Sequence, residues 1–220
     1  MAALGGVLCV LSACSIERPV EHPPNKPMTP ASQSMEALAA LSTVAREGRE
    51  SEYRREFFGR SWHDVDGNGC NQRDDVLLRD VVPGTVRSVR QGSCPHDVIA
   101  GTWVDPYSGV SLAFSDLKEP DQAQAIQIDH VVPLAEAWAS GAASWSDERR
   151  ERYANDLGTL LAVDGPTNAS KGSNDPAAWR PKKEFQCDYA RRWIAIKSAW
   201  RLGVDPSERR ALKEMLAVCG

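Results

Sequence analysis

The spacing of apolar residues changes about halfway along the chain, and the change predicts strands first and helices later. Between residues 76 and 114 the apolar residues form short runs, some of which alternate with polar residues as strands do. Pro, Ser and Gly gather at 106–109 and predict a turn. The predicted strands cover residues 76–78, 85–89, 102–104, 110–114 and, further on, 126–132.

Helical spacing governs both ends of the chain. Apolar residues from Met35 to Ala45 fit one face of a short helix that ends before Gly48. After the strand at 126–132 we expect a short helix at 135–139, a helix from a Ser146 cap through Tyr153, a loop and helix start at 157–175, a long helix at 183–202, and a last helix after Asp205. One face of the long helix carries an aromatic stripe, which we interpret as core rather than as a surface for stacking nucleobases. The stripe consists of Tyr189, Trp193, Ile196 and Trp200.

A carboxylate and a histidine stand side by side at Asp129 and His130, near the end of a predicted strand. An isolated pair of this kind is more often a surface hydrogen bond, so its neighbours decide the interpretation. Asn155 follows, and Asn168 opens the run Asn-Ala-Ser-Lys-Gly. An imidazole accepts a proton from water near neutral pH, and carboxylate and amide oxygens bind hard divalent ions. This order of residues is typical of metal-assisted hydrolysis of phosphodiester bonds.

Two motifs resemble the HNH, or ββα-metal, endonucleases: Asp-His-Val-Val-Pro-Leu at 129–134 and Asn-Ala-Ser-Lys-Gly at 168–172. From Tyr53 to Cys219 the chain is similar to secreted bacterial HNH proteins, which are related to the C-terminal nuclease domain of GmrSD-type restriction enzymes. With this resemblance we expect an α+β fold in residues 35–220, with a small antiparallel sheet, a ββα-metal core and a C-terminal helical pair.

The resemblance also implies roles for the motif residues. It assigns His130 as the general base and Asp129 and Asn168 as ligands of one metal ion. It makes Asn155 the residue that braces the loop carrying the histidine, and it places Lys171 near the scissile phosphate. The last family position is Asn168 rather than histidine, and a neutral amide oxygen favours Mg²⁺ or Mn²⁺ over zinc.

The charge of the chain gives little support to nucleic-acid binding. The net charge is −4, with an acidic first half and a nearly neutral second half, whereas a nonspecific nucleic-acid clamp normally shows a positive excess. Local clusters of basic residues are equally typical of solvated helix faces. Within them Arg149 is a candidate for binding phosphate, and Arg73 is a second candidate by the family resemblance.

A second group of oxygen-bearing residues lies between Asp64 and Asp75. Asp64, Asp66 and Asn68 occupy positions one, three and five of an EF-hand-like loop, and Asp75 stands at position twelve, where glutamate is usual. The sequence predicts a strand after this loop, where an EF-hand needs a helix. Two interpretations therefore stay open: a Ca²⁺ site, or a turn closed by hydrogen bonds among its own side chains.

The N-terminus resembles an export signal. Residues 1–14 are apolar and small and end in Leu-Ser-Ala-Cys, which resembles the lipobox of bacterial lipoproteins with Cys14 as the lipidated residue. The Pro-rich stretch at 15–34 is expected to be a tether. The protein is then extracellular or in the cell envelope, attached to a membrane only through this lipid or else secreted.

Export leaves four cysteines outside the signal, and these suggest two disulfides in an oxidising compartment. Three pairings are open, and we favour Cys70 with Cys94 and Cys187 with Cys219 because each closes a local loop. A zinc site is less favoured, since the sequence has no Cys-x-x-Cys pair.

The favoured hypothesis is a monomeric, exported endonuclease that hydrolyses nucleic acid, with DNA favoured over RNA, by means of His130 and one Mg²⁺ or Mn²⁺ ion. The alternative is an exported, calcium-stabilised binding lipoprotein on an inactive nuclease scaffold. Plasmid nicking separates the two.

Overall fold

The computed structural model describes residues 30–45 and 52–219. The expected signal peptide, its Cys14 and most of the expected tether lie outside these residues. Within the described part, no helix combines the length and the apolar character needed to cross a membrane.

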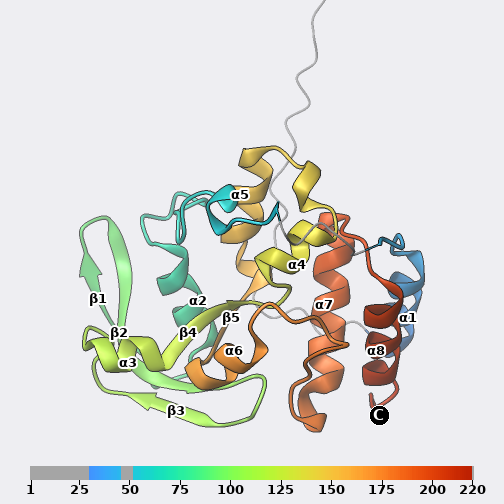
Figure 1. The fold of residues 1–220 in the computed structure, drawn as a ribbon. Coiled ribbons are helices and arrows are strands. Elements are labelled where there is room, and N and C mark those ends of the chain that lie inside the picture. Colours follow the sequence, from blue (N-terminus) through green and yellow to red (C-terminus); the bar gives the residue numbers. More distant parts are fainter. Residues whose placement is uncertain (1–29, 46–51, 220) are drawn as a thin grey trace, which may run out of the picture.

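The fold is α+β, as expected, with two small antiparallel sheets and helices around them (Figure 1). One sheet has the order β1-β2-β3, and the other is the two-stranded ribbon β4-β5. In chain order the elements are α1 (Ala31–Ala40), η2 (Arg55–Phe58), α2 (Gln72–Asp80), β1 (Arg87–Gln91), β2 (Cys94–Val104), β3 (Ser111–Phe114), α3 (Pro120–Ala125), β4 (Ile126–His130), α4 (Leu134–Ala139), η3 (Ala142–Ser144), α5 (Asp147–Asn155), η4 (Leu157–Thr159), β5 (Leu160–Asp164), α6 (Gly165–Lys171), η5 (Lys183–Phe185), α7 (Gln186–Trp200) and α8 (Pro206–Leu216).

The β4-β5 ribbon lies between two hydrophobic clusters. Successive side chains of a strand point to opposite faces. Accordingly Leu161 and Val163 of β5 belong to the larger cluster, whereas Leu160 and Ala162 belong to the smaller one. The ribbon therefore joins the helical half of the molecule to the three-stranded sheet, and apolar burial on both faces fixes its register.

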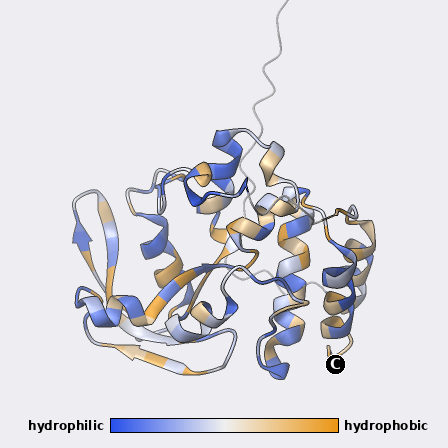
Figure 2. Cartoon of the chain, viewed as in Figure 1, coloured by the Kyte–Doolittle hydropathy of each residue, from blue (hydrophilic) through white to orange (hydrophobic). Residues whose placement is uncertain are grey.

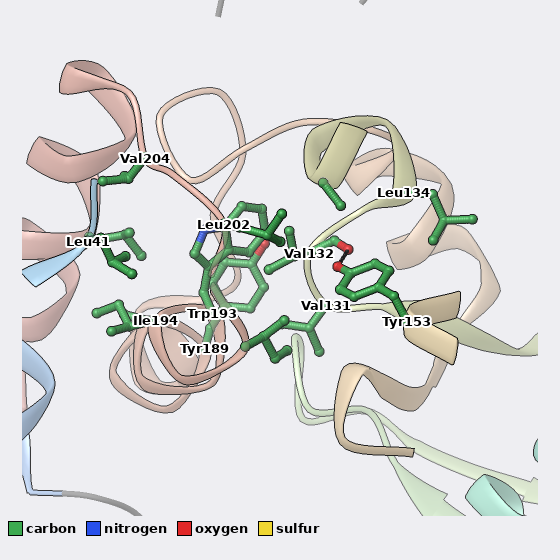
Figure 3. Packing of buried hydrophobic residues seen from close by; sticks show 14 of the residues in the cluster. Leu41, Val131, Val132, Leu134, Tyr153, Tyr189, Trp193, Ile194, Leu202 and Val204 are labelled. Atoms are coloured by element: carbon green, nitrogen blue, oxygen red, sulfur yellow. Dashed lines mark hydrogen bonds between the residues drawn. The ribbon is translucent and has the colours of Figure 1, made fainter. Parts of the chain in front are cut away.

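The C-terminal helices form the larger cluster together with the segment that leaves β4. Figure 2 shows α7 and α8 with alternating hydrophobic and hydrophilic bands, as expected for helices that bury one face. Tyr189 and Trp193 of α7 lie in this cluster with Leu202 and Val132 (Figure 3). Tyr153 is also buried there, and its hydroxyl donates to the Val132 carbonyl over 2.7 Å. The aromatic stripe of α7 is thus core, as interpreted from the sequence.

Several predicted elements are confirmed with small shifts at their ends. Ser146 caps α5 by accepting a hydrogen bond from the Arg149 N–H, and Asp205 forms a capping box with Glu208 at the start of α8. The strands predicted around residues 87, 103 and 112 are present, as is the turn at 106–109.

Three predictions were wrong. Residues 76–78 lie in helix α2 rather than in a strand, because Asn71 caps a helix whose first turn carries Asp74 and Asp75. Strand β5 was missed because its residues are buried on both faces and show no alternation. Helix α1 begins at Ala31, inside the expected tether, and ends at Ala40 rather than near Gly48.

Both favoured disulfides have bonding geometry. The Cys70 and Cys94 sulfurs are 1.95 Å apart, and the Cys187 and Cys219 sulfurs are 2.03 Å apart. The first bond ties the loop before α2 to the start of β2, and the second ties the start of α7 to the end of the chain after α8.

Removing the second disulfide tests its contribution to the helical half. Its cysteines are 32 residues apart, and the bond restricts the conformations of the unfolded chain. The double substitution Cys187→Ser, Cys219→Ser removes this restriction and is expected to lower the free energy of unfolding by about 3 kcal/mol. Urea denaturation of the oxidised wild type and the variant measures this difference. Equal unfolding midpoints and slopes would contradict the assignment.

Candidate active site

The residues of the two motifs meet where the β4-β5 ribbon joins helix α6. Asp129 and His130 are the last two residues of β4 and pair with Leu161 and Leu160 of β5. Helix α6 follows β5 directly and packs against both strands. It begins sharply because the Asp164 side chain accepts a hydrogen bond from the Thr167 N–H. The result is a strand–strand–helix unit whose two strands are separated in sequence by an insertion containing α4 and α5.

A hollow of about 460 Å³ opens at this junction, and we call it the His130 hollow. It contains Asp129, His130, Asn168 and Arg73, so the structure brings four of the predicted site residues together. Its walls come from four separate stretches of the chain. The lining residues are Tyr53, Arg55, Trp62, Arg73, Gln127, Ile128, Asp129, His130, Pro133, Leu134, Ala135, Asn168, Gly172 and Ser173.

Asp129 is buried and bound through both carboxylate oxygens. Lys171 Nζ donates to Oδ1 over 2.9 Å, and the Tyr107 hydroxyl donates to Oδ2 over 2.6 Å. Burial raises the pKa of Asp129, and the Lys171 charge opposes that shift. Because a carboxylate has about four lone-pair directions, these two hydrogen bonds leave acceptor capacity on both oxygens.

Lys171 does not lie where we expected it, beside a substrate phosphate. Its side chain is 0% exposed, and Nζ also donates to the His130 carbonyl over 3.0 Å. Burial lowers the pKa of Lys171, whereas the neighbouring Asp129 raises it. Lys171 therefore positions Asp129 and the end of β4, and it does not line the His130 hollow.

The turn between β2 and β3 supplies Tyr107. Gly109, with φ +72°, allows the chain to reverse, and its N–H donates to the Asp105 carbonyl over 2.8 Å. Asp105 is fully buried and accepts a hydrogen bond from the Asp164 N–H, which docks the turn onto the end of β5. The Tyr107 hydroxyl reaches Asp129 for this reason. The sequence predicted the turn but gave no sign of this contact.

His130 is buried, and its hydrogen bond fixes the tautomer. Nε2 lies 2.8 Å from the Ala154 carbonyl oxygen. A carbonyl only accepts hydrogen bonds, so Nε2 carries the proton in the neutral ring and Nδ1 is the basic nitrogen. Burial lowers the pKa of His130 to about 4, so the ring is neutral at pH 7.

Asn168 is oriented by a residue that the sequence analysis missed. Its Nδ2 donates to Gln127 Oε1 over 2.9 Å, which turns the Asn168 amide oxygen away from Gln127. Gln127 lies two residues before Asp129, on the same face of β4, so strand alternation alone was a sufficient signal. The Asp129 carboxylate and the Asn168 amide oxygen in this hollow are donors of the kind that bind hard divalent ions.

Asn155 braces a different loop from the one expected. Its Oδ1 accepts a hydrogen bond from the His63 N–H over 2.9 Å, and its Nδ2 donates to the Arg60 carbonyl over 2.9 Å. These bonds fix the loop that carries Trp62, not the end of β4. The connection to His130 runs instead through the preceding residue, Ala154, whose carbonyl accepts from the ring.

The two arginines proposed from the sequence lie in different places. Arg73 lines the His130 hollow, although its Nη2 also donates to the Ala123 and Ile126 carbonyls. Arg149 does not line it, since its guanidinium lies over the Trp145 ring and donates to the Trp200 carbonyl. The structure adds Arg55, which lines the hollow and whose charge acts to lower the pKa of His130.

The Asp64–Asp75 loop is closed by its own hydrogen bonds. Asp64 accepts from the N–H groups of Gly67, Asn68 and Gly69, and Asn68 donates to Asp66 and Asp75. Asp75 also lies 2.7 Å from His96 Nε2. A helix does follow the loop, unlike the strand that we expected. The oxygen atoms of the loop nevertheless accept hydrogen bonds from within the loop itself, which favours the turn interpretation over a Ca²⁺ site.

Cys70, Cys94 and His96 also lie together, with ligand atoms within 4.8 Å of one another. Metals bind thiolates, and both of these sulfurs are committed to the disulfide. This group therefore stabilises the fold rather than holding an ion.

A family model for the C-terminal domain of GmrSD restriction endonucleases matches residues 72–215. The chain belongs to this family. The match contains both strands of the ribbon and all of α6, but it begins after Tyr53, Arg55 and Trp62 of the His130 hollow.

The chain is also similar along its whole length to an uncharacterized secreted protein of Arthroderma benhamiae. The two are 39% identical over 218 residues, which cover 96% of this chain and 98% of the relative. No solved structure matches the chain. The bacterial origin implied by the sequence resemblance stays a prediction.

The low pKa of His130 predicts acid-sensitive stability. Between about pH 6.5 and 4 the unfolded chain protonates His130 while the folded chain does not, so the free energy of unfolding falls as the pH drops through this window. The loss attributable to this residue is on the order of 3 kcal/mol. Denaturation of wild type and His130→Asn in EDTA, at pH 7 and pH 4, measures it. The two proteins should differ in acid sensitivity, and parallel losses would refute the assignment.

The buried pair predicts a stability defect when Lys171 loses its charge. Lys171→Met leaves the Asp129 carboxylate buried without a counter-ion, which is expected to cost about 3–5 kcal/mol at neutral pH. The cost should shrink at low pH, where Asp129 is protonated. Adding Asp129→Leu to the variant should recover most of the loss. Urea denaturation of both variants checks this, and full stability of Lys171→Met would show that the pair is not formed.

Proposed function

We propose that the protein is an exported, metal-dependent endonuclease that hydrolyses DNA phosphodiester bonds in the His130 hollow. The observation that carries the proposal is the convergence of Asp129, His130 and Asn168 in one hollow, on the ββα unit of a nuclease family. Neither the family nor the hollow alone specifies a reaction; the combination supplies a base, a set of oxygen ligands and cationic walls.

His130 acts as the general base. At neutral pH its ring is uncharged, and Nδ1 is the nitrogen that accepts a proton from the attacking water. The Ala154 carbonyl then stabilises the imidazolium through the Nε2–H hydrogen bond, and Tyr153 packs parallel to the ring, with 6.5 Å between centroids. Because the ring is held by these contacts, the base needs no reorientation when water binds.

Asp129 and Asn168 would hold one divalent ion, and their oxygen donors would favour Mg²⁺ or Mn²⁺. When bound, such an ion would polarise the phosphate as a Lewis acid and stabilise charge on the leaving oxygen. Lys171 and Tyr107 position the Asp129 carboxylate, and Gln127 orients the Asn168 amide. The ligand atoms are therefore fixed by residues behind them.

Cationic side chains at the hollow neutralise the substrate phosphates. Arg73 and Arg55 both line the hollow and can offer guanidinium groups to a phosphate, which Arg binds in bidentate geometry. The net charge of −4 implies that attraction to DNA is local rather than spread over the surface.

The setting of this activity is outside the cytoplasm. The relative is described as secreted, and the two disulfides suit an oxidising compartment. We further propose that the mature protein is a monomer, tethered through a lipid on Cys14 or released. No feature of the described residues favours the alternative of a calcium-stabilised binding lipoprotein, so that alternative enters only as an outcome of the test.

Plasmid nicking tests the proposed reaction directly. Wild type is expected to nick supercoiled DNA with Mg²⁺ or Mn²⁺ but not in EDTA. His130→Ala should lower the rate at least about 100-fold, because it removes the base. Gel electrophoresis of time courses measures the rates.

His96→Ala is the matched control, because His96 binds Asp75 beside the disulfide and lies outside the His130 hollow. It should nick at the wild-type rate. Equal rates for His130→Ala and wild type would defeat the base assignment. No nicking with any metal would favour a binding protein on an inactive scaffold.

A further inference from the structure

One wall of the His130 hollow carries an indole ring in a strained backbone position. Trp62 lines the hollow and also a second, small hollow, and Arg55 and His130 line both of them. Its φ of 59° lies in the left-handed region, where a bulky residue is a genuine outlier. Such outliers persist only where the surrounding structure enforces them, and they cluster at functional sites.

The surrounding structure does enforce this position. Asn155 bonds to the loop on both sides of Trp62, at the Arg60 carbonyl and the His63 N–H. His63 Nδ1 lies 2.8 Å from Glu151 Oε1, which adds a third link to α5. The ring is thus presented by a braced loop rather than by a freely moving one, as preorganised binding requires.

The Trp62 ring is only partly buried, so core packing alone does not explain its position. Trp62 is half-buried and packs on the edge of the smaller hydrophobic cluster, while the rest of it faces the hollow. Arg55, a cation on the same segment of the chain, lines the same two hollows as Trp62. An aromatic ring next to an arginine is the combination that binds single-stranded nucleic acid, by stacking on a base and pairing with its phosphate.

We propose that Trp62 stacks on a nucleobase next to the scissile phosphate, while Arg55 binds an adjoining phosphate, so that this wall selects unpaired nucleotides. This inference rests on the proposed nuclease function and adds the substrate feature that the hollow recognises. It assigns the role to residues outside the segment matched by the family model.

The experiment compares binding of two fluorescent oligonucleotides of equal length, one with thymine bases and one abasic throughout. All proteins carry His130→Ala so that strands stay intact, and Mg²⁺ is present. The parent protein should bind the thymine strand about tenfold more tightly than the abasic strand. Trp62→Leu should abolish this preference, and Trp62→Phe should retain most of it. Fluorescence anisotropy gives the affinities.

Trp145→Leu is the matched control, because Trp145 is half-buried against Arg149 and Trp200, away from the hollow. It should keep the preference for bases. Thermal unfolding of every variant identifies any that fails to fold. If Trp62→Leu fails, Trp62→Phe and Arg55→Gln serve as the test. Arg55→Gln should lower the affinity for the thymine strand and for the abasic strand by the same factor. Retention of the preference in Trp62→Leu, or its absence in the parent, would overturn the inference. Because this assay measures binding without cleavage, its result can be interpreted even if the nicking assay fails.

Discussion

The ion pair between Asp129 and Lys171 is the interaction on which the arrangement of this site depends. Removing two charges from water costs several kcal/mol per ion, and only good geometry with further hydrogen bonds repays it. Here the remaining bonds come from the Tyr107 hydroxyl and the His130 carbonyl. The pair ties α6 to the end of β4. Asn168 lies one turn before Lys171 on the same helix face, so the same tie sets the position of the Asn168 amide relative to the Asp129 carboxylate.

The ribbon explains why these polar residues lie where they do. Strand β5 is buried over its first four residues, with alternate side chains in two different clusters. A ribbon in such surroundings has little solvent face on which polar groups can lie, so they are accommodated at the end of a strand, where the His130 hollow opens, or in pairs. Asp129 and His130 are the last residues of β4, the strand that pairs with β5, and Asp129 is also paired with Lys171. Their side chains leave opposite faces of the strand, and the hollow reaches both because the strand ends there.

Much of this arrangement was predictable from sequence. The strand that carries Asp129 and His130 and the capped helices follow from local patterns of spacing and capping, the α+β class was expected together with the family resemblance, and both disulfides were the favoured pairing because each closes a local loop. Strand β5 did not, because a run buried on both faces has no periodicity to read. The burial of Lys171 was equally hidden, since a lysine near a predicted metal site is normally taken to meet solvent or phosphate. Tyr107 and Arg55 reach the site through tertiary contacts that leave no trace in spacing.

The end of α5 connects His130 to the loop that carries Trp62. Two consecutive residues there make the contacts. The Ala154 carbonyl accepts a hydrogen bond from the His130 ring, and the Asn155 side chain forms hydrogen bonds with the loop that carries Trp62. Any shift of this helix end therefore moves the imidazole and the indole together. The family match contains the helix end but not the loop. The loop outside the family match is thus held by the same helical turn that orients the His130 ring, so the substrate contacts proposed for the loop and the chemistry proposed for His130 are positioned by one element.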